Sequence, residues 1–573
     1  MDETIDPRLA RERVPAAHYR VVVIGGGING AGLFRDLCLQ GVDTLLVDSA
    51  DFCAGASAGP SRLIHGGIKY LETGEFRLVR QSTLERNLLL KNAPHYVKPI
   101  QTVLPIRSWF GGIGPSAIRF FGGHAKIRDR GVLITRLGLA LFDFYGRRHR
   151  VMPNHRVTLR ERTRAAFPDL ARDAVATATY YDARITHAER LGLELLLDGM
   201  AAHEPSLALN HVALERREGT TLVLRDRVGG RTHRVRADMV VNAAGAWIDR
   251  VNAALDVRSA YIGGAKGSHL ILDNPRLYRA LDGKMIYFGV SDGRVGLLYP
   301  FMGKVLVGST DVPIDDPDTA TCDDVERDYM LGTLGEVFPD IPVGPEQIVY
   351  AYSGVRPLPR AGTGDTGAVS RDHSILTDIL PGTDVPLLSL VGGKWTTFRG
   401  FAEEAADRVL AHLDMPRRVA TALLPIGGGK QFPRAAADRE AMLSRLAGTG
   451  LPGGRPDVLL DRYGTGALPI AAWCAGRQDR TLASLPDYSR AEIGYLLTHE
   501  CVGCLADVLF RRTDIALSGR LTSAVAAEVA SIAAAVLGWD GARVAAELKD
   551  CSAVATRRHG LGPLVSQPGE LLA

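Results

Sequence analysis

The sequence predicts a mixed α/β protein, part α/β and part α+β, with a parallel-sheet domain, an antiparallel-sheet domain and a helical C-terminal domain. Three observations predict this fold class. The β-branched run VVVI at 21–24 is typical of a strand buried inside a parallel sheet. Strand-like runs such as SHLILD and VLVGST lie between residues 260 and 375. Near the end of the chain, TSAVAAEVASIAAAVLGW has the apolar spacing of a helix.

The length and composition narrow the class further. A chain of 573 residues is long enough for two or three domains, and 46% apolar with 23% charged residues is ordinary for a globular protein. The 68 Lys and Arg residues nearly balance the 64 Asp and Glu residues, and a net charge of +4 argues against nucleic acid as a partner. The seven cysteines are scattered, which fits a reducing compartment. Cys501 and Cys504 form a C-x-x-C, for which packed thiols are favoured over a metal site, so no metal is expected.

The N-terminal unit carries a nucleotide-binding pattern. Residues 20–48 read strand, glycine-rich turn, helix and strand, with Gly25, Gly27 and Gly30 in the spacing G-x-G-x-x-G. Gly25 makes the tight turn, Gly27 lets the backbone approach a pyrophosphate, and Gly30 lets the helix pack closely on the strand. Asp48 ends the second strand, where an acid binds ribose hydroxyls and disfavours a 2′-phosphate. The pattern predicts a dinucleotide, NAD or FAD, but not NADP.

A second strand returns to the same domain later in the chain. Residues 238–247, DMVVNAAGAW, read as a strand that runs into a small-residue turn, although an ordinary core strand competes with this interpretation. Together with the stretch near 385–412, it predicts a discontinuous nucleotide-binding domain. The segments between, including 260–375, are expected to form the antiparallel substrate sheet.

Ten sequence blocks in a fixed order carry a resemblance to a known family. The chain resembles, from about residue 20 to about residue 520, the FAD-dependent glycerol-3-phosphate dehydrogenases, within the glycine/D-amino-acid oxidase-like flavoproteins. The blocks are IGGGINGAG, LIHGGIKYLETGEFRLV, LLLKNAPH, YYDARI, NAAGAW, KGSHLIL, VGSTDVP, YSGVRPL, SRDHSI and GGKWTTFR. LIHGGIKYLE at 63–72 is similar to that family's hallmark near the flavin.

The resemblance implies site residues. It implies His65 as the base that takes the hydroxyl proton, since the ordinary pKa of histidine lies near working pH. For the substrate and its phosphate it implies Lys69, Tyr70, Arg356, Arg371 and Lys394. For FAD it implies Gly25, Gly27, Asn29, Gly30, Asp48, Ser57, Ser61, Leu63, His65, Gly66, Gly67, Ala244, Gly245, Thr310, Asp311, Gly354, Gly393, Lys394 and Thr396.

The chain also departs from the family pattern. Lys69 stands where the family usually has Arg, and a lysine offers phosphate a point charge where arginine offers a planar fork. Gly59 and Pro60 replace polar residues, and Asp48 is shorter than the family's usual Glu. Residues 107–130 look longer than the usual connection and mix aromatic with basic side chains. These departures bear on the choice of substrate more than on the chemistry.

The implied function is FAD-dependent oxidation of a polyol phosphate, by default sn-glycerol 3-phosphate to dihydroxyacetone phosphate, with electrons passed to a quinone or another acceptor. A dehydrogenase for a tetritol phosphate, such as erythritol phosphate, is the alternative that Lys69 keeps open. An amine oxidase of the same fold is disfavoured because its substrates need one carboxylate clamp and not several cations. An FAD-dependent RNA-modifying protein is disfavoured by the near-neutral charge. A flavin-binding scaffold without activity also stays open.

The domain limits that we expect are 18–424 for the oxidoreductase region, 434–550 for the helical C-terminal domain and 551–573 for a loose tail. PIGGGKQFP at 425–433 reads as a linker. The N-terminus does not read as a signal peptide, and no run of 18 apolar residues occurs. We therefore expect a cytoplasmic protein, with 107–130 as a candidate for peripheral contact with the inner face of the cell membrane. A homodimer is left open.

Overall fold

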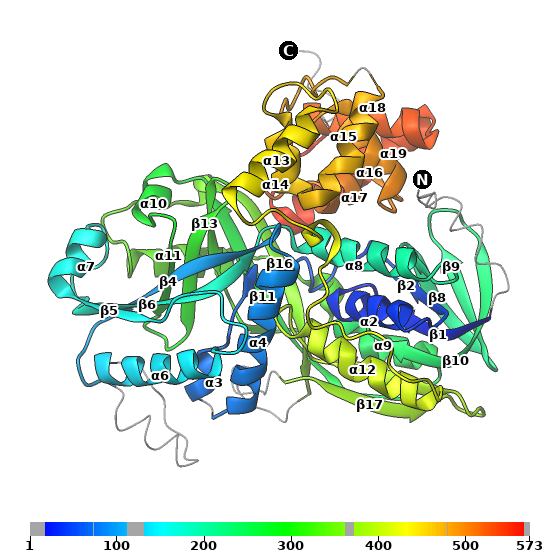
Figure 1. Cartoon of the computed structure of the whole chain (residues 1–573), viewed down its shortest axis with the longest axis horizontal. Coiled ribbons are helices and arrows are strands. Elements are labelled where there is room, and N and C mark those ends of the chain that lie inside the picture. Colours follow the sequence, from blue (N-terminus) through cyan, green and yellow to red (C-terminus); the bar gives the residue numbers. More distant parts are fainter. Residues whose placement is uncertain (1–17, 73, 112–130, 361–371, 478, 566–573) are drawn as a thin grey trace.

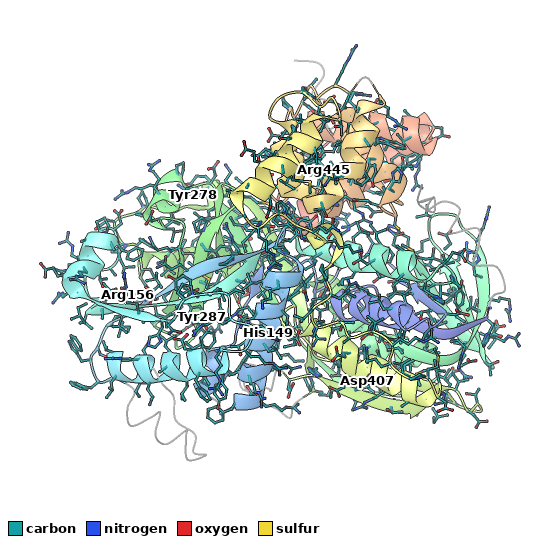
Figure 2. All side chains as sticks on the ribbon, in the orientation of Figure 1. His149, Arg156, Tyr278, Tyr287, Asp407 and Arg445 are labelled. Carbon is teal, nitrogen blue, oxygen red and sulfur yellow. The ribbon has the colours of Figure 1, made fainter. Side chains whose placement is uncertain are left out.

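The computed structural model describes residues 18–72, 74–111, 131–360, 372–477 and 479–565. Two sheets lie side by side in Figure 1, each with helices packed on it, and a helical domain sits above them. Figure 2 shows charged side chains such as Asp407 and Arg445 on the outer surface of the helices. The predicted fold class is confirmed.

The first sheet joins three distant parts of the chain. The strands predicted in 20–48, 238–247 and 385–412 lie next to one another in it and run parallel. In spatial order the strands are β17 (Ser374–Ile379), β18 (Pro386–Val391), β10 (Thr232–Asn242), β1 (His18–Ile24), β2 (Thr44–Val47) and β7 (Leu207–Leu209). The hairpin of β8 (Val212–Glu218) and β9 (Thr221–Asp226) joins β10 through β9.

Strand β1 is buried on both faces, as a central parallel strand requires. Val21 and Val23 face a layer formed by the helices α2 (Ile28–Leu39), α8 (Ala188–Ala202) and α12 (Phe398–His412). Val22 and Ile24 face the other side, against β7, the β8–β9 hairpin and the end of α9 (Ile248–Ala254). The continuous apolar run at 21–24 is therefore explained by burial of β1 on both faces.

The second sheet is antiparallel except for one pair of strands. Its order is β15 (Val312–Pro313), β11 (Ile262–Leu272), β14 (Lys304–Gly308), β13 (Val295–Phe301), β12 (Met285–Gly289), β4 (Val97–Ile106), β6 (Ala176–Ile185) and β3 (Leu63–Ile64). Strand β16 (Ile348–Pro359) also pairs with β11, and β5 (Arg156–Leu159) pairs with β6. The helices packed around this sheet are α3 (Lys69–Glu72), α4 (Phe76–Asn92), α6 (Val132–Tyr145), α7 (Arg160–Ala166), α10 (Pro275–Ala280) and α11 (Asp324–Gly335).

Strand β4 lies in the middle of this sheet although it contains two prolines. Pro99 and Pro105 cannot donate a hydrogen bond, and prolines normally mark edge strands. The parallel pairing with β12 is confined to Thr102 and Val103, between the two prolines, whereas β6 pairs along the whole strand. The short contact with β12 explains how a proline-containing strand is tolerated in an interior position.

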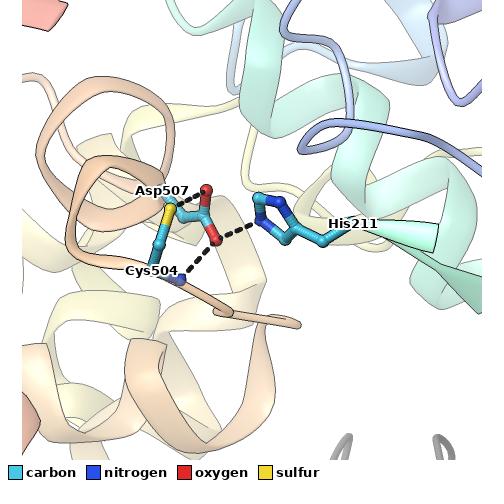
Figure 3. A group of neighbouring side chains, drawn as sticks. All are labelled: His211, Cys504 and Asp507. Atoms are coloured by element: carbon cyan, nitrogen blue, oxygen red, sulfur yellow. Dashed lines mark hydrogen bonds and ion pairs between the residues drawn. The ribbon is translucent and has the colours of Figure 1, made fainter. Parts of the chain in front are cut away.

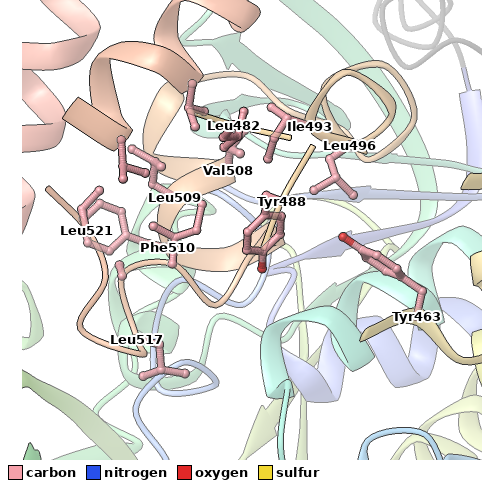
Figure 4. Packing of buried hydrophobic residues seen from close by; sticks show 14 of the residues in the cluster. Tyr463, Leu482, Tyr488, Ile493, Leu496, Val508, Leu509, Phe510, Leu517 and Leu521 are labelled. Carbon is pink, nitrogen blue, oxygen red and sulfur yellow. The ribbon is translucent and has the colours of Figure 1, made fainter. Parts of the chain in front are cut away.

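The C-terminal domain is helical, as predicted. Its helices are α13 (Ala436–Ala447), α14 (Arg455–Tyr463), α15 (Ala467–Ala475), α16 (Arg490–His499), α17 (Leu505–Asp507), α18 (Ser523–Leu537) and α19 (Gly541–His559), with a π-helical turn at Val508–Arg512. Figure 4 shows the core, in which residues such as Tyr488, Ile493 and Leu509 are fully buried. Helix α16 begins with a capping box, because the Ser489 hydroxyl accepts from the Glu492 amide and the Glu492 carboxylate accepts from the Ser489 amide.

The tail predicted for 551–573 is wrong in its first part, because α19 continues to His559. Cys551 and Ala555 are buried against the domain core, and His559 stacks on Tyr350 of β16. The helix ends at Gly560, whose left-handed φ of +64° suits glycine at a helix C-terminus. The spacing of two small buried residues is a weak apolar signal, which is why the sequence did not reveal this last stretch of helix.

Candidate active site

A cleft of about 1430 Å³ lies between the two sheets and contains most of the predicted site residues. Gly30 and Gly66 do not line it, and Arg371 lies outside the described residues. The predicted residues that line the cleft are Gly25, Gly27, Asn29, Asp48, Ser57, Ser61, Leu63, His65, Gly67, Lys69, Tyr70, Ala244, Gly245, Thr310, Asp311, Gly354, Arg356, Gly393, Lys394 and Thr396.

The glycine-rich turn between β1 and α2 forms one end of the cleft. Gly25 has a φ of +111°, and a Cβ there would lie 2.6 Å from the carbonyl oxygen of Ala243 in the neighbouring strand connection. A Cβ on Gly30 would lie 1.9 Å from the carbonyl oxygen of Gly25. Helix α2 begins at Ile28, whose amide donates to the Ser57 hydroxyl at 2.9 Å. The turn has no room for side chains at these two glycines, and Gly25 and Gly27 line the cleft with backbone atoms alone.

Asp48 lies beside this turn. Its carboxylate accepts from the amides of Gly26 at 2.7 Å and Ala50 at 2.9 Å. Burial raises the pKa of Asp48 to about 6, against the effect of the two amides. The acid therefore has a fixed orientation at the edge of the cleft, which is compatible with the predicted contact to a ribose.

Two aromatic rings pack against the two glycines of the hallmark segment, LIHGGIKYLE. A Cβ on Gly66 would lie 2.5 Å from the ring of Phe142, and a Cβ on Gly67 would lie 2.3 Å from the ring of Tyr70. Gly67 also has a φ of +77°. The Gly66 amide donates to the buried carboxylate of Asp182 at 2.8 Å. The resemblance places these glycines near the flavin, and the structure shows that packing within the protein already requires both.

The two side chains that flank these glycines reach the cleft. His65 is held through its amide, which donates to the Thr396 hydroxyl at 3.2 Å, and its ring centroid lies 6.1 Å from that of Tyr70. Lys69 is exposed at the cleft wall. Lys394 Nζ lies 4.3 Å from the centroid of the Tyr70 ring. The sequence-predicted base and the predicted cation Lys394 thus lie beside Tyr70, and Lys69 precedes Tyr70 in the chain.

Arg356 is held by the loop that follows β14. It donates to the Asp311 carboxylate at 3.0 Å, to the Ser309 hydroxyl at 3.3 Å and to the Thr310 carbonyl oxygen at 3.2 Å. A Cβ on Gly267 would lie 2.2 Å from the guanidinium group, so glycine at 267 leaves the space for it. These contacts fix the orientation of Arg356 in the cleft wall.

Further polar residues line the cleft that the sequence analysis named only within family blocks, such as KGSHLIL and YYDARI, or not at all. His269 lines the cleft, and its Nε2 lies 2.7 Å from the Ser61 hydroxyl. Burial lowers the pKa of His269 to about 3, so the ring is neutral. Asp182, Tyr180 and Tyr287 also line the cleft. Asp182 belongs to the YYDARI block, where an acid inside an apolar strand was the signal that could have identified it.

Outside the cleft, the C-x-x-C lies in a polar cluster that Figure 3 shows. Asp507 accepts from His211 at 3.0 Å, and its other oxygen lies 3.1 Å from the Cys504 sulfur. These three residues could supply nitrogen, sulfur and oxygen ligands to a metal ion. However, Asp507 also forms an ion pair with Arg511 at 2.7 Å, and burial raises the pKa of the Cys504 thiol. A cation would compete with a guanidinium group, so we interpret the cluster as a hydrogen-bond network.

Comparison with known proteins identifies the class. A family model described as FAD dependent oxidoreductase matches residues 20–408, and one described as the C-terminal domain of alpha-glycerophosphate oxidase matches residues 419–544. The cleft and these matches define an FAD-dependent oxidoreductase.

Individual relatives narrow the class. A glycerol-3-phosphate dehydrogenase of Synechocystis sp. is 32% identical over 525 residues, 87% of this chain and 89% of the relative. D-erythritol 1-phosphate dehydrogenase of Brucella abortus is 32% identical over 512 residues, 86% of this chain and 93% of the relative. The structure of glycerol-3-phosphate dehydrogenase from Bacillus halodurans complexed with FAD has the same fold, with a TM-score of 0.72, 23% identity, and 96% and 97% of the two chains covered. The chain belongs to the FAD-dependent glycerol-3-phosphate dehydrogenase family.

FAD is the cofactor of this family, and the cleft residues fit it. Two polar atoms in the cleft wall, Asn29 Oδ1 and Lys394 Nζ, are buried without a hydrogen-bond partner among the described residues. Buried polar groups normally have partners, so both atoms indicate a polar ligand in the cleft. The glycine turn and Asp48 suit the diphosphate and ribose of FAD, and the flavin itself would supply hydride acceptance.

The glycine turn yields a testable prediction. Gly30→Ala places a methyl group 1.9 Å from the Gly25 carbonyl oxygen, so the turn must open. We expect the FAD dissociation constant to rise at least about tenfold, measured by flavin titration, with a low flavin-to-protein absorbance ratio after purification. Gly138→Ala in α6 is the control, since a Cβ there meets no atom within 4 Å. Full flavin content in Gly30→Ala would contradict the role assigned to the turn.

Proposed function

We propose that the protein oxidises the secondary alcohol of a polyol phosphate, with sn-glycerol 3-phosphate to dihydroxyacetone phosphate as the default reaction. Two relatives, each 32% identical over most of the chain, are named as dehydrogenases of such compounds. FAD, when held in this cleft, would supply hydride acceptance, and a quinone or another acceptor would take the electrons.

The observation that carries this proposal is the amine of Lys394. Its Nζ is buried in the cleft wall beside Tyr70 without a hydrogen-bond partner among the described residues. A buried ammonium group without a partner is costly, and an anionic group of the substrate would relieve that cost. A phosphate is the anion that the names of the relatives indicate.

The other cations in the cleft contribute differently. Arg356 already pairs with Asp311, which offsets its charge. Its contribution to substrate binding is therefore oriented hydrogen bonds more than net positive charge. Lys69 lies at the exposed part of the wall and adds a positive charge there. A phosphate monoester carries close to two negative charges near neutral pH, which Lys394 and Lys69 together balance. Because Asp311, Ser309 and Thr310 hold the guanidinium group of Arg356, this side chain would present the phosphate with a fixed donor.

His65 is the proposed base. It lies in the cleft wall next to Tyr70, and its backbone is fixed by the Thr396 hydroxyl. Oxidation of an alcohol removes a proton from the hydroxyl oxygen and a hydride from the carbon that bears it. A neutral imidazole can accept that proton. His269, whose pKa burial lowers to about 3, is a poorer base and is suited to hydrogen bonding instead.

A tetritol phosphate is the second candidate substrate. The Brucella abortus relative is named D-erythritol 1-phosphate dehydrogenase, and its identity to this chain equals that of the Synechocystis relative. Lys69 supports this candidate, because its compact ammonium group takes less space than the planar guanidinium group of an arginine. The space that remains could admit a longer carbon chain.

The substrate is tested by anaerobic titration of the purified holoenzyme with three- and four-carbon polyol phosphates. We expect glycerol 3-phosphate to bleach the flavin absorbance, with Lys69→Arg shifting selectivity further toward the three-carbon substrate. Selectivity that is unchanged in Lys69→Arg would count against its role in chain-length choice. A flavin that no polyol phosphate bleaches would overturn the proposed reaction.

Two substitutions separate binding from chemistry. Lys394→Ala removes a charge-assisted contact of about 1.5–3 kcal/mol, so we expect roughly a tenfold or larger rise in the apparent substrate dissociation constant. His65→Ala should instead slow flavin reduction at saturating substrate by about a hundredfold or more. Stopped-flow measurement of flavin reduction against substrate concentration gives both quantities. A His65→Ala enzyme with the original rate and pH profile would assign the base to another group.

We also propose peripheral contact with a membrane. Among the described residues, no helix is long and apolar enough to cross a bilayer. Helix α6 buries Val132, Leu139 and Phe142, but Leu133, Leu137 and Phe144 on its other side are each more than half exposed. Three apolar side chains on the outside of one helix are unusual unless something covers them.

The surroundings of α6 favour a lipid surface. Arg136, Arg147 and Arg148 are exposed on and just after the helix, and the exposed Trp109 and Phe110 lie next to its start, since the Leu133 amide donates to the Trp109 carbonyl oxygen. Apolar side chains ringed by cations suit the boundary of an anionic bilayer, where a quinone acceptor would be available. Residues 112–130, the rest of the segment that the sequence analysis singled out, lie outside the described residues.

Vesicle sedimentation tests this contact. Wild-type protein should sediment with vesicles of phosphatidylcholine and phosphatidylglycerol at low salt and less so at high salt. Replacing Leu133, Leu137 and Phe144 with Ser should lower the partition coefficient at least about tenfold. Val325→Ser is the control, because Val325 is 79% exposed on a different helix, α11. Wild-type protein that stays in the supernatant at low salt would exclude α6 as an anchor.

A further inference from the structure

The loop that follows β2 is a wall of the cofactor cleft. Seven of its residues line the cleft: Asp48, Ser49, Ala50, Ala54, Gly55, Ala56 and Ser57. The loop fits against the glycine turn, because the Gly26 amide donates to Asp48 and the Cys53 amide donates to the Gly26 carbonyl oxygen at 3.1 Å. Its position therefore determines the shape of the part of the cleft nearest the turn.

Small residues and a strained backbone leave this loop in need of an anchor. Ala54, Gly55 and Ala56 offer little side chain for packing. Cys53 has a φ of +57°, a left-handed conformation that residues other than glycine adopt only where their surroundings hold them. The loop therefore depends on contacts outside itself to keep one conformation.

Asp51 supplies that anchor, and its partners come from the C-terminal domain. The side chain is 1% exposed, and its two oxygens accept from Arg512 at 2.7 and 2.8 Å. Arg511 donates to the same carboxylate through its Nε. Asn210, which precedes β8, donates to it at 2.8 Å. A buried carboxylate held by two guanidinium groups is a rigid attachment, since leaving either charge unpaired would be costly.

A second attachment joins the same domain to the other side of this wall. The His211 amide donates to the Ala50 carbonyl oxygen at 2.8 Å, and its ring contacts Asp507 at 3.0 Å. Val212 directly after it lines the cleft. Asp507, which Figure 3 shows beside His211, in turn pairs with Arg511, so both attachments meet in one network. Helix α19 of the same domain also brings Arg558 to the cleft.

We propose that the C-terminal helical domain is part of the cofactor-binding apparatus: Asp51, paired with Arg511 and Arg512, is a positioning residue that holds the 48–57 loop in the conformation that binds FAD. A preorganised loop binds its ligand more tightly because ordering costs nothing further at binding. This role depends on FAD as the cofactor and is independent of which polyol phosphate is oxidised.

The test compares FAD affinity in Asp51→Asn and in a matched control. Asp51→Asn keeps the size of the side chain and removes its charge, so we expect the FAD dissociation constant of the full-length protein to rise about tenfold or more. Flavin fluorescence during titration and during release from the holoenzyme reports the affinity without any substrate. The control is Glu492→Gln, which breaks a buried pair with Arg455 at 2.7 Å inside the same domain.

Glu492→Gln should lower the unfolding temperature but leave the FAD dissociation constant within about twofold. Arg511→Lys, which keeps the charge and loses the fork, should weaken FAD binding in the same direction as Asp51→Asn and carries the test if that variant does not fold. Amide hydrogen exchange of residues 48–57 should become faster in Asp51→Asn and Arg511→Lys and not in the control. Unchanged FAD affinity in Asp51→Asn and Arg511→Lys, or an equal loss in Glu492→Gln, would overturn the proposal.

Discussion

Three nearly buried guanidinium groups hold the parts of this protein in place. Arg62 pairs with Glu189, Arg190 pairs with Glu500, and Arg512 pairs with Asp51. The first pair ties the segment before β3 to α8, and the other two tie the C-terminal domain to α8 and to the loop after β2. Because an unpaired buried charge costs several kcal/mol, none of these parts can shift without its partner. The cleft lies among the elements that these pairs fix.

Polar groups near the cleft fall into two sets. The first set, Asp182 and Arg356, makes hydrogen bonds to other side chains of the protein, Arg86 and Asp311. Asn29 Oδ1, Lys394 Nζ and His269 Nδ1 are buried without hydrogen-bond partners among the described residues. Buried polar atoms without partners are rare in folded proteins unless a ligand or water completes them. We therefore propose that the second set contacts ligands, and that the first set keeps the cleft wall in position.

The sequence predicted the features that depend on local pattern. The run VVVI, the glycine spacing and Asp48 lie within 30 residues of one another, and each has a fixed geometric role in a β–α–β unit. The pair of Asp51 and Arg512 is separated by 461 positions, so no local pattern could reveal it. Strand β4 was hidden by its prolines, and the end of α19 by small residues in place of large apolar ones.

The glycines of the hallmark segment match the family pattern, but the physical reason for them lies in packing within the protein. Gly66 and Gly67 are required by the rings of Phe142 and Tyr70, which occupy the space where a Cβ would lie. Tyr70 in turn lies under the Lys394 amine. Gly67 thus lets Tyr70 fold back against the segment and place its ring beside the cation that we assign to the substrate phosphate. We infer that the contribution of Gly67 to function is indirect: it sets the position of Tyr70, and Tyr70 lies beside Lys394 and His65.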